Sequence, residues 1–118
     1  MIRFVHCFNY AEGVSREEGD AWYLGEHAAR ARALPGLVGY VSYPQVPVGL
    51  PLPNPHDRFV RRSELHFEDL DAALSAVHGN LDLWAPSQPG VPGFREFECM
   101  FMNENPEYDL LRDAPPEH

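Results

Sequence analysis

The chain has 118 residues, enough for one domain, and its 18 acidic against nine basic residues give a net charge of −9, which opposes binding to nucleic acids and anionic membranes. All nine basic residues are arginine, and the lack of lysine excludes Schiff-base chemistry on a lysine, including a lysine-tethered pyridoxal cofactor. No run approaches the roughly 20 apolar residues of a membrane span, and no signal-peptide core follows Met1, so we expect a cytoplasmic protein.

The first predicted element is a strand over residues 2–8, with apolar side chains on both faces. One face carries Ile2, Phe4, His6 and Phe8, and the other carries Val5 and Cys7. Such a strand is covered on both sides, as a central strand would be if its second face packs on a partner sheet. Cys7 and Cys99 have the spacing of neither a disulfide framework nor a metal motif, so we expect a reduced buried pair.

A helix is predicted over residues 16–34. Ser15 followed by Glu18 forms a capping box at its start, and Pro35-Gly36 ends it. Side chains at spacings of three and four share one face of this helix: Asp20, Tyr23, His27 and Arg30. A face with this composition suits a polar cavity better than a dry core.

A second strand is predicted over residues 37–43, and a proline-rich segment follows at residues 44–55. Its five prolines rule out a helix or a central strand, because each lacks an N–H and fixes φ. Four aliphatic side chains argue against a purely solvated linker: Val46, Val48, Leu50 and Leu52. The segment is either a lid over a pocket or an arm of a dimer.

The third predicted strand, residues 59–66, has no cleanly apolar face. Phe59, Arg61, Ser63 and Leu65 alternate with Val60, Arg62, Glu64 and His66. A sheet strand normally alternates hydrophobic and polar residues, so this mixture indicates that part of one face lines a water-accessible space. A helix over residues 67–78, an irregular stretch over 81–93 and a strand over 94–102 follow. We expect one domain over residues 1–103 and an acidic tail over 104–118.

Two blocks of the sequence carry a family resemblance. The first joins Trp22, Tyr23 and His27 to Leu34-Pro35-Gly36-Leu37 and Tyr40; the second is Asp57 with Glu64-Leu65-His66-Phe67 before a helix. These blocks resemble the EthD-like family of the dimeric α/β-barrel superfamily. The resemblance implies an α+β, ferredoxin-like βαββαβ monomer with a four-stranded antiparallel sheet. It also implies a homodimer formed by stacking two sheets, and a small-molecule pocket in or beside the barrel.

His27 and Glu64 are the candidate catalytic residues. Both the resemblance and the helix face select His27, and an unperturbed imidazole titrates near neutrality. Arg30 nearby favours the neutral imidazole that a general base requires. Glu64 matches the strand-three glutamate of the family. Either residue also fits a structural role, His27 as a core histidine and Glu64 as a solvated carboxylate.

Five further residues are candidates for substrate binding: Tyr23, Tyr40, Arg30, His6 and His66. His6, Glu64 and His66 lie on strands that would be neighbours, but no compact metal motif joins them, and we expect no metal and no cofactor. The predicted activity is cofactor-independent proton transfer, of isomerase or lyase type, on a hydrophobic carbonyl-bearing substrate such as a lactone, polyketide or aromatic catabolite. The alternatives are a cofactor-free or haem-dependent oxygenase of the same fold and a noncatalytic small-molecule binding protein.

Overall fold

The computed structural model of the chain describes residues 1–46, 48–84 and 93–112. In these ranges the strands are β1 (Ile2–Tyr10), β2 (Leu37–Pro44), β3 (Arg61–Phe67) and β4 (Phe94–Asn103). The α-helical segments are α1 (Arg16–Trp22), α2 (Ala28–Arg32) and α3 (Leu70–His78). The strands form one antiparallel sheet in the order β2-β3-β1-β4, which confirms the predicted βαββαβ arrangement and α+β class.

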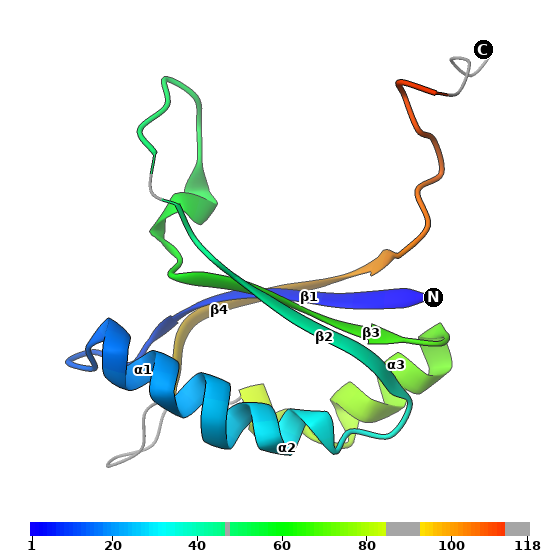
Figure 1. The fold of residues 1–118 in the computed structure, drawn as a ribbon, viewed down its shortest axis with the longest axis horizontal. Helices are drawn as coiled ribbons and strands as arrows, with labels where there is room; N and C mark the ends of the chain where they lie inside the picture. The colour runs from blue at the N-terminus through cyan, green and yellow to red at the C-terminus, as the bar shows by residue number, and fades with distance from the viewer. Residues whose placement is uncertain (47, 85–92, 113–118) are drawn as a thin grey trace.

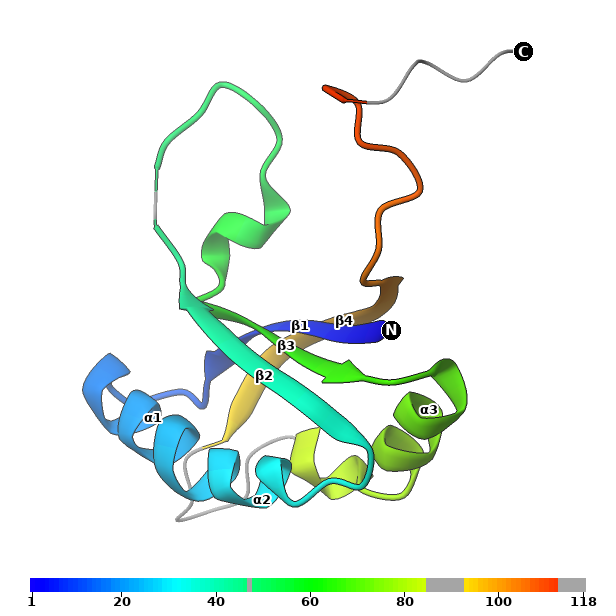
Figure 2. The same ribbon diagram turned by 45° about the vertical axis from the view of Figure 1, so that its right-hand side comes forward.

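The α-helices α1, α2 and α3 all lie on one face of this sheet, and the opposite face is open (Figure 1). The connection between β2 and β3 and the segment after β4 both project from the open side, as the turned view also shows (Figure 2). We call these two faces the helix face and the open face. No helix in the described ranges is long and apolar enough to cross a membrane.

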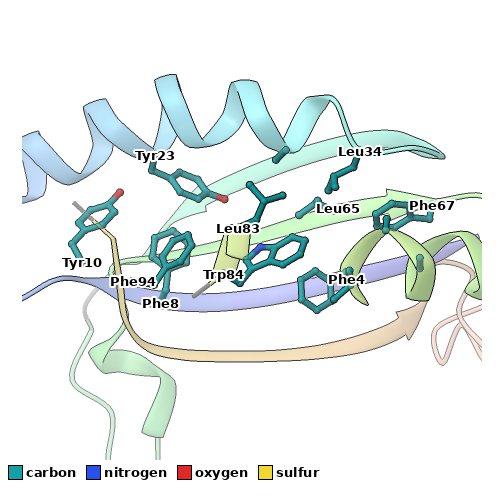
Figure 3. Packing of buried hydrophobic residues seen from close by; sticks show 14 residues of the cluster. Phe4, Phe8, Tyr10, Tyr23, Leu34, Leu65, Phe67, Leu83, Trp84 and Phe94 are labelled. Atoms are coloured by element: carbon teal, nitrogen blue, oxygen red, sulfur yellow. The ribbon is translucent and has the colours of Figure 1, made fainter. Parts of the chain in front are cut away.

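The hydrophobic core fills the space between the sheet and the helices (Figure 3). Phe4 and Phe8 of β1 lie at its centre and contact the rings of Trp84 and Phe94 with centroid separations of 5.2 and 4.6 Å. Because side chains alternate along a strand, the neighbours of these core residues on β1 point to the open face. Alternate side chains of each strand therefore point to the packed helix face and to the open face.

The ends of the first helix form as the sequence predicts. The Ser15 hydroxyl accepts a hydrogen bond from the backbone N–H of Glu18, which forms the N-cap, and it donates one to the carboxylate of the same residue. At the other end Gly36 has a φ of +78°, a conformation that only glycine adopts without strain. The Pro35-Gly36 turn can therefore lead directly into β2.

The helix between these ends differs from the predicted regular helix. Residues Tyr23–His27 form one π-helical turn between α1 and α2. This wider turn changes which side chains face the sheet, so the buried positions are Gly19, Tyr23, His27 and Ala31. Arg30, predicted on the same face, is exposed to solvent instead. A π turn of this kind often marks a functional site.

Two other predicted segments need correction. The third helix begins at Leu70 rather than at residue 67, because Phe67 still belongs to β3 and the Asp69 carboxylate caps the backbone N–H of Ala72. In the proline-rich segment all four aliphatic side chains are exposed, from 51% for Val48 to 70% for Val46. The interpretation of this segment as a lid over the chain's own pocket is therefore wrong. Residues 85–92 of the irregular stretch and 113–118 of the tail lie outside the described residues.

Gly19 offers a test of this packing. A Cβ at Gly19 would overlap the ring of Tyr10, whereas a Cβ at Gly25 would meet open space. We predict that Gly19→Ala lowers the free energy of unfolding by about 1 to 3 kcal/mol, since the overlap outweighs the gain in helix propensity. Gly25→Ala is the matched control and should be neutral or stabilising by up to about 1 kcal/mol. Equal denaturation midpoints for the two variants would contradict the packing of Tyr10 against α1.

Candidate functional site

The hydroxyl group of Tyr23 lies at the centre of a buried polar cluster on the helix face. It accepts a hydrogen bond from the Tyr40 hydroxyl at 2.7 Å and donates one to Ser63 Oγ at 2.6 Å. His6 Nε2 lies 3.3 Å from the same oxygen, and the tautomer of His6 decides which group donates. Tyr23, His6 and Ser63 are completely buried, so these contacts are shielded from water.

The cluster continues from Ser63 toward the end of the sheet. Ser63 donates to Ser42 Oγ at 2.8 Å, and Arg61 Nη1 donates to the same oxygen at 3.1 Å. The Arg61 guanidinium also forms an ion pair with Asp20 at 3.2 Å, and Tyr10 donates a hydrogen bond to that carboxylate. A buried cation is thus held at one end of the hydroxyl groups.

A groove of about 330 Å³ opens the cluster to solvent between the helix and the edge strand β2. Its floor contains the hydroxyl-bearing side chains of Tyr23, Tyr40 and Ser42. Leu24 and Ala28 form an apolar wall, and Arg32 adds a charge. This volume and this mixture of apolar and polar lining are typical of small-molecule sites.

His27 lies behind Tyr23, among aromatic rings. Its ring stacks on that of Tyr23 with a centroid separation of 5.0 Å and an interplanar angle of 18°. Trp22 and Phe94 contact its other sides at 5.2 and 5.0 Å. Within the described residues Nε2 of His27 has no hydrogen-bond partner, and His27 is absent from the lining of the groove.

Both buried histidines are held in the neutral form. Burial, and then the neighbouring His27, lowers the pKa of His6 to about 3. Burial, and then Arg30, lowers the pKa of His27 to about 4, so the expected effect of Arg30 on this imidazole is present. At neutral pH each imidazole is therefore uncharged.

The remaining sequence candidates lie elsewhere. Glu64 and His66 are on the open face, where Glu64 is buried and accepts hydrogen bonds from Arg3 and Arg62 at 3.3 Å. His66 Nε2 lies 3.2 Å from the Glu64 carboxylate. Arg30 points to solvent and pairs with Asp82 at 2.5 Å. The structure therefore brings together His6, Tyr23, Tyr40 and His27, and it separates them from Glu64, His66 and Arg30.

Four polar residues of the site are missing from the sequence candidates: Ser42, Ser63, Arg61 and Arg32. A signal for two of them was present in the third strand, whose mixed face placed Arg61 and Ser63 with Leu65. Arg32 lines the groove with Ala28 and Leu24, four and eight residues earlier on the helix, whereas the sequence analysis selected Arg30 on the face of Tyr23 and His27. The described residues contain no group of three or more His, Cys, Asp or Glu side chains arranged to hold a metal ion.

The lowered pKa values make stability depend on pH. Between pH 6.5 and about 4 the unfolded chain binds protons at His6 and His27, whereas the folded chain does not. Folding stability is therefore complete above pH 6.5 and falls as the pH falls below it, by up to about 1.4 kcal/mol per pH unit for each histidine. We predict a loss of unfolding free energy between pH 7 and pH 5, measured by urea denaturation.

Replacing one buried histidine measures its share of this dependence of stability on pH. His27→Gln should roughly halve the slope of stability against pH in this window, whereas His78→Gln, an exposed change at the end of α3, should leave the slope unchanged. An unfolding free energy that stays constant from pH 7 to pH 5 in the unmodified chain would contradict the burial of neutral histidines.

The fold was compared with known proteins. No protein-family model and no curated protein match the sequence. Among solved structures, an ethyl tert-butyl ether D (EthD) family protein from Bacillus halodurans matches with a TM-score of 0.63 at 16% identity, over 89% of this chain and 99% of that one. A DABB family protein with a ferredoxin-like fold from Mesorhizobium loti matches with a TM-score of 0.61 at 15% identity, over 89% of this chain and 97% of that one.

A third match is a protein from Arabidopsis thaliana, with a TM-score of 0.62 at 12% identity, over 92% of this chain and 99% of that one. At such low identities these matches concern the fold and carry no activity across. They agree with the four-stranded antiparallel sheet and with the order of its elements. The chain therefore has the ferredoxin-like fold of these proteins, the EthD family protein among them.

Proposed function

We propose that the protein binds a carbonyl-bearing small molecule in the groove beside β2 and moves a proton on it. One observation carries this proposal: hydrogen-bonding groups run without a break from Tyr40 in the groove, through Tyr23, to the buried neutral imidazole of His6. A hydroxyl group can both accept and donate a proton. The two tyrosines can therefore connect a bound substrate with a base that does not itself line the groove.

The proton transfer follows from this geometry. With its proton on Nδ1, His6 presents Nε2 as an acceptor, and for the transfer the Tyr23 hydroxyl turns its proton from Ser63 Oγ to this nitrogen. As a substrate C–H bond breaks, Tyr40 takes the proton, passes its own to Tyr23, and Tyr23 passes its own to His6. The products are an enolate in the groove and an imidazolium at His6, and return of the proton to another atom gives an isomer. The negative charge of the enolate raises the pKa of His6 while it exists.

The two catalytic candidates from the sequence, His27 and Glu64, do not transfer the proton directly in this scheme. His27 supports the ring of Tyr23 from behind, so we assign it the role of holding the Tyr23 hydroxyl in line with His6. Glu64 is on the opposite side of the sheet and takes no direct part in the transfer. Replacing Glu64 should therefore affect the open face rather than the chemistry of the groove.

Exchange of the α-protons of a ketone with D2O, followed by NMR, tests this proposal. With acetophenone as the probe, His6→Gln and Tyr23→Phe should each slow the catalysed exchange by roughly a hundredfold, the usual scale for loss of a positioned acid or base. His27→Gln should slow it less, because that side chain acts through Tyr23. If acetophenone binds in the groove and none of these variants changes its exchange, the protein binds ligands without catalysis and the proton-transfer proposal is wrong.

We further propose that the open face packs against a second copy of the chain. Exposed apolar side chains on this face include Val41, Tyr43, Met100 and Met102. The two projecting segments flank it and carry further apolar side chains, such as Leu50 and Leu110 (Figures 1 and 2). Apolar area of this kind on both the sheet and its flanking segments is typical of a protein interface. The proline-rich segment would then serve as the dimer arm that the sequence analysis left open.

Sedimentation velocity tests this assembly. The unmodified chain should sediment as a dimer at micromolar concentration, and Met100→Asp should shift it toward monomer because the change places a charge in the apolar contact. Leu24→Asp, a matched change on the helix side of the molecule, should leave the dimer intact. A stable monomer of the unmodified chain at this concentration would rule the dimer out.

A further inference from the structure

The charges around the groove are unusual for a chain of net charge −9. Within the described residues every arginine except one forms an ion pair with a carboxylate: Arg3, Arg16, Arg30, Arg58, Arg61, Arg62, Arg95 and Arg112. The exception is Arg32, which lines the groove and donates from Nε to the backbone carbonyl of Ala28 at 3.3 Å. Its outer guanidinium nitrogens have no carboxylate partner among the described residues.

A second cation lies beneath the floor of the groove. Arg61 is buried, with 7% of its surface exposed, and it donates to the Ser42 hydroxyl that lines the groove. Its counterion Asp20 is shared with Arg16 at 3.2 Å, and within the described residues Nε of Arg61 has no partner. One carboxylate thus faces two arginines, and Arg32 adds a third positive charge.

Both cations act on the hydroxyl of Tyr40, which lines the same groove. Burial, and then the adjacent Tyr23 hydroxyl, raises the pKa of Tyr40, whereas Arg32 and Arg61 act in the opposite direction. Positive charge beside a desolvated hydroxyl attracts an anionic group more strongly than it would in open water. The low-dielectric wall formed by Leu24 and Ala28 strengthens this attraction.

We propose that the ligand of the groove carries a carboxylate, bound by Arg32 and by the hydroxyl of Ser42, with Arg61 behind them. The inference rests on the groove being the ligand site of the proposed function, and it adds the chemical class of the ligand. The apolar wall beside these groups accommodates a ring or short aliphatic chain, so the class is a small aryl or alkyl carboxylic acid. A ligand that also bears a ketone would place its reacting carbon beside Tyr40.

Titration of the full chain with benzoate and with benzamide, followed by amide chemical shifts in NMR at constant ionic strength, tests the proposal. Benzamide has nearly the same shape but no charge. Benzoate should shift the signals of Leu24, Ala28 and Ser42 and bind at least about tenfold more tightly than benzamide, the scale of one hydrogen bond to a charged group. Arg32→Gln should remove this preference, and Arg32→Lys should restore part of it.

A second arginine provides the control for net charge. Arg95 is on β4, at the opposite edge of the sheet from β2, so Arg95→Gln removes one positive charge far from the groove and should leave benzoate binding unchanged. The inference is overturned if benzamide binds as tightly as benzoate, if benzoate does not bind in the groove, or if Arg95→Gln weakens benzoate as much as Arg32→Gln. If the protein exchanges the protons of acetophenone but binds benzoate no better than benzamide, the proton-transfer proposal stands and the carboxylate inference fails. If it prefers benzoate but does not exchange ketone protons, only the inference about the ligand class stands.

Discussion

The Tyr23 hydroxyl is the interaction on which the rest of the site depends. It links the helix to β1, β2 and β3 through His6, Tyr40 and Ser63, and the Tyr23 side chain is itself completely buried. A buried hydroxyl without partners costs a few kcal/mol, so the three strands and the helix must keep their relative positions for it to stay satisfied. The same contacts that fix the helix on the sheet also connect the groove with a neutral histidine. Structure and proposed chemistry therefore share one constraint.

The sheet separates two kinds of chemistry that are close together in the sequence. Ser63 and Glu64 are consecutive residues of β3, yet Ser63 joins the hydroxyl cluster while Glu64 is held by Arg3 and Arg62 on the open face. Alternation along the strand is sufficient to explain this division. It leaves the helix face with tyrosines, serines and neutral histidines, a set suited to passing protons. The open face has apolar side chains and paired charged side chains.

Local patterns in the sequence predicted the elements well, because capping, turn and alternation signals are short in range. The N-cap at Ser15, the glycine turn at Gly36 and the two faces of β3 all form as predicted. Tyr23, Tyr40 and His6 were each candidates from the sequence, but the sequence placed His6 beside Glu64 and His66, and only the structure joins it to the two tyrosines. Periodicity could not foresee the π turn, so Arg30 was chosen where the structure places Arg32 in the groove. Periodicity also could not show that His27 and Glu64 lie on opposite sides of the sheet, because that depends on how the helix packs against the strands.

The most direct test of this account is the titration of the histidine side chains in ¹⁵N-labelled protein, followed by NMR. A neutral His6 connected to Tyr23 is the central claim, and it requires no knowledge of the substrate. We predict that His6 and His27 remain uncharged down to pH 5, because their pKa values are lowered to about 3 and about 4. Tyr23→Phe should change the ring nitrogen shifts of His6, since it removes the hydroxyl at 3.3 Å. A His6 that becomes charged near pH 6.5, the ordinary value for an exposed imidazole, with shifts indifferent to Tyr23→Phe, would contradict the account.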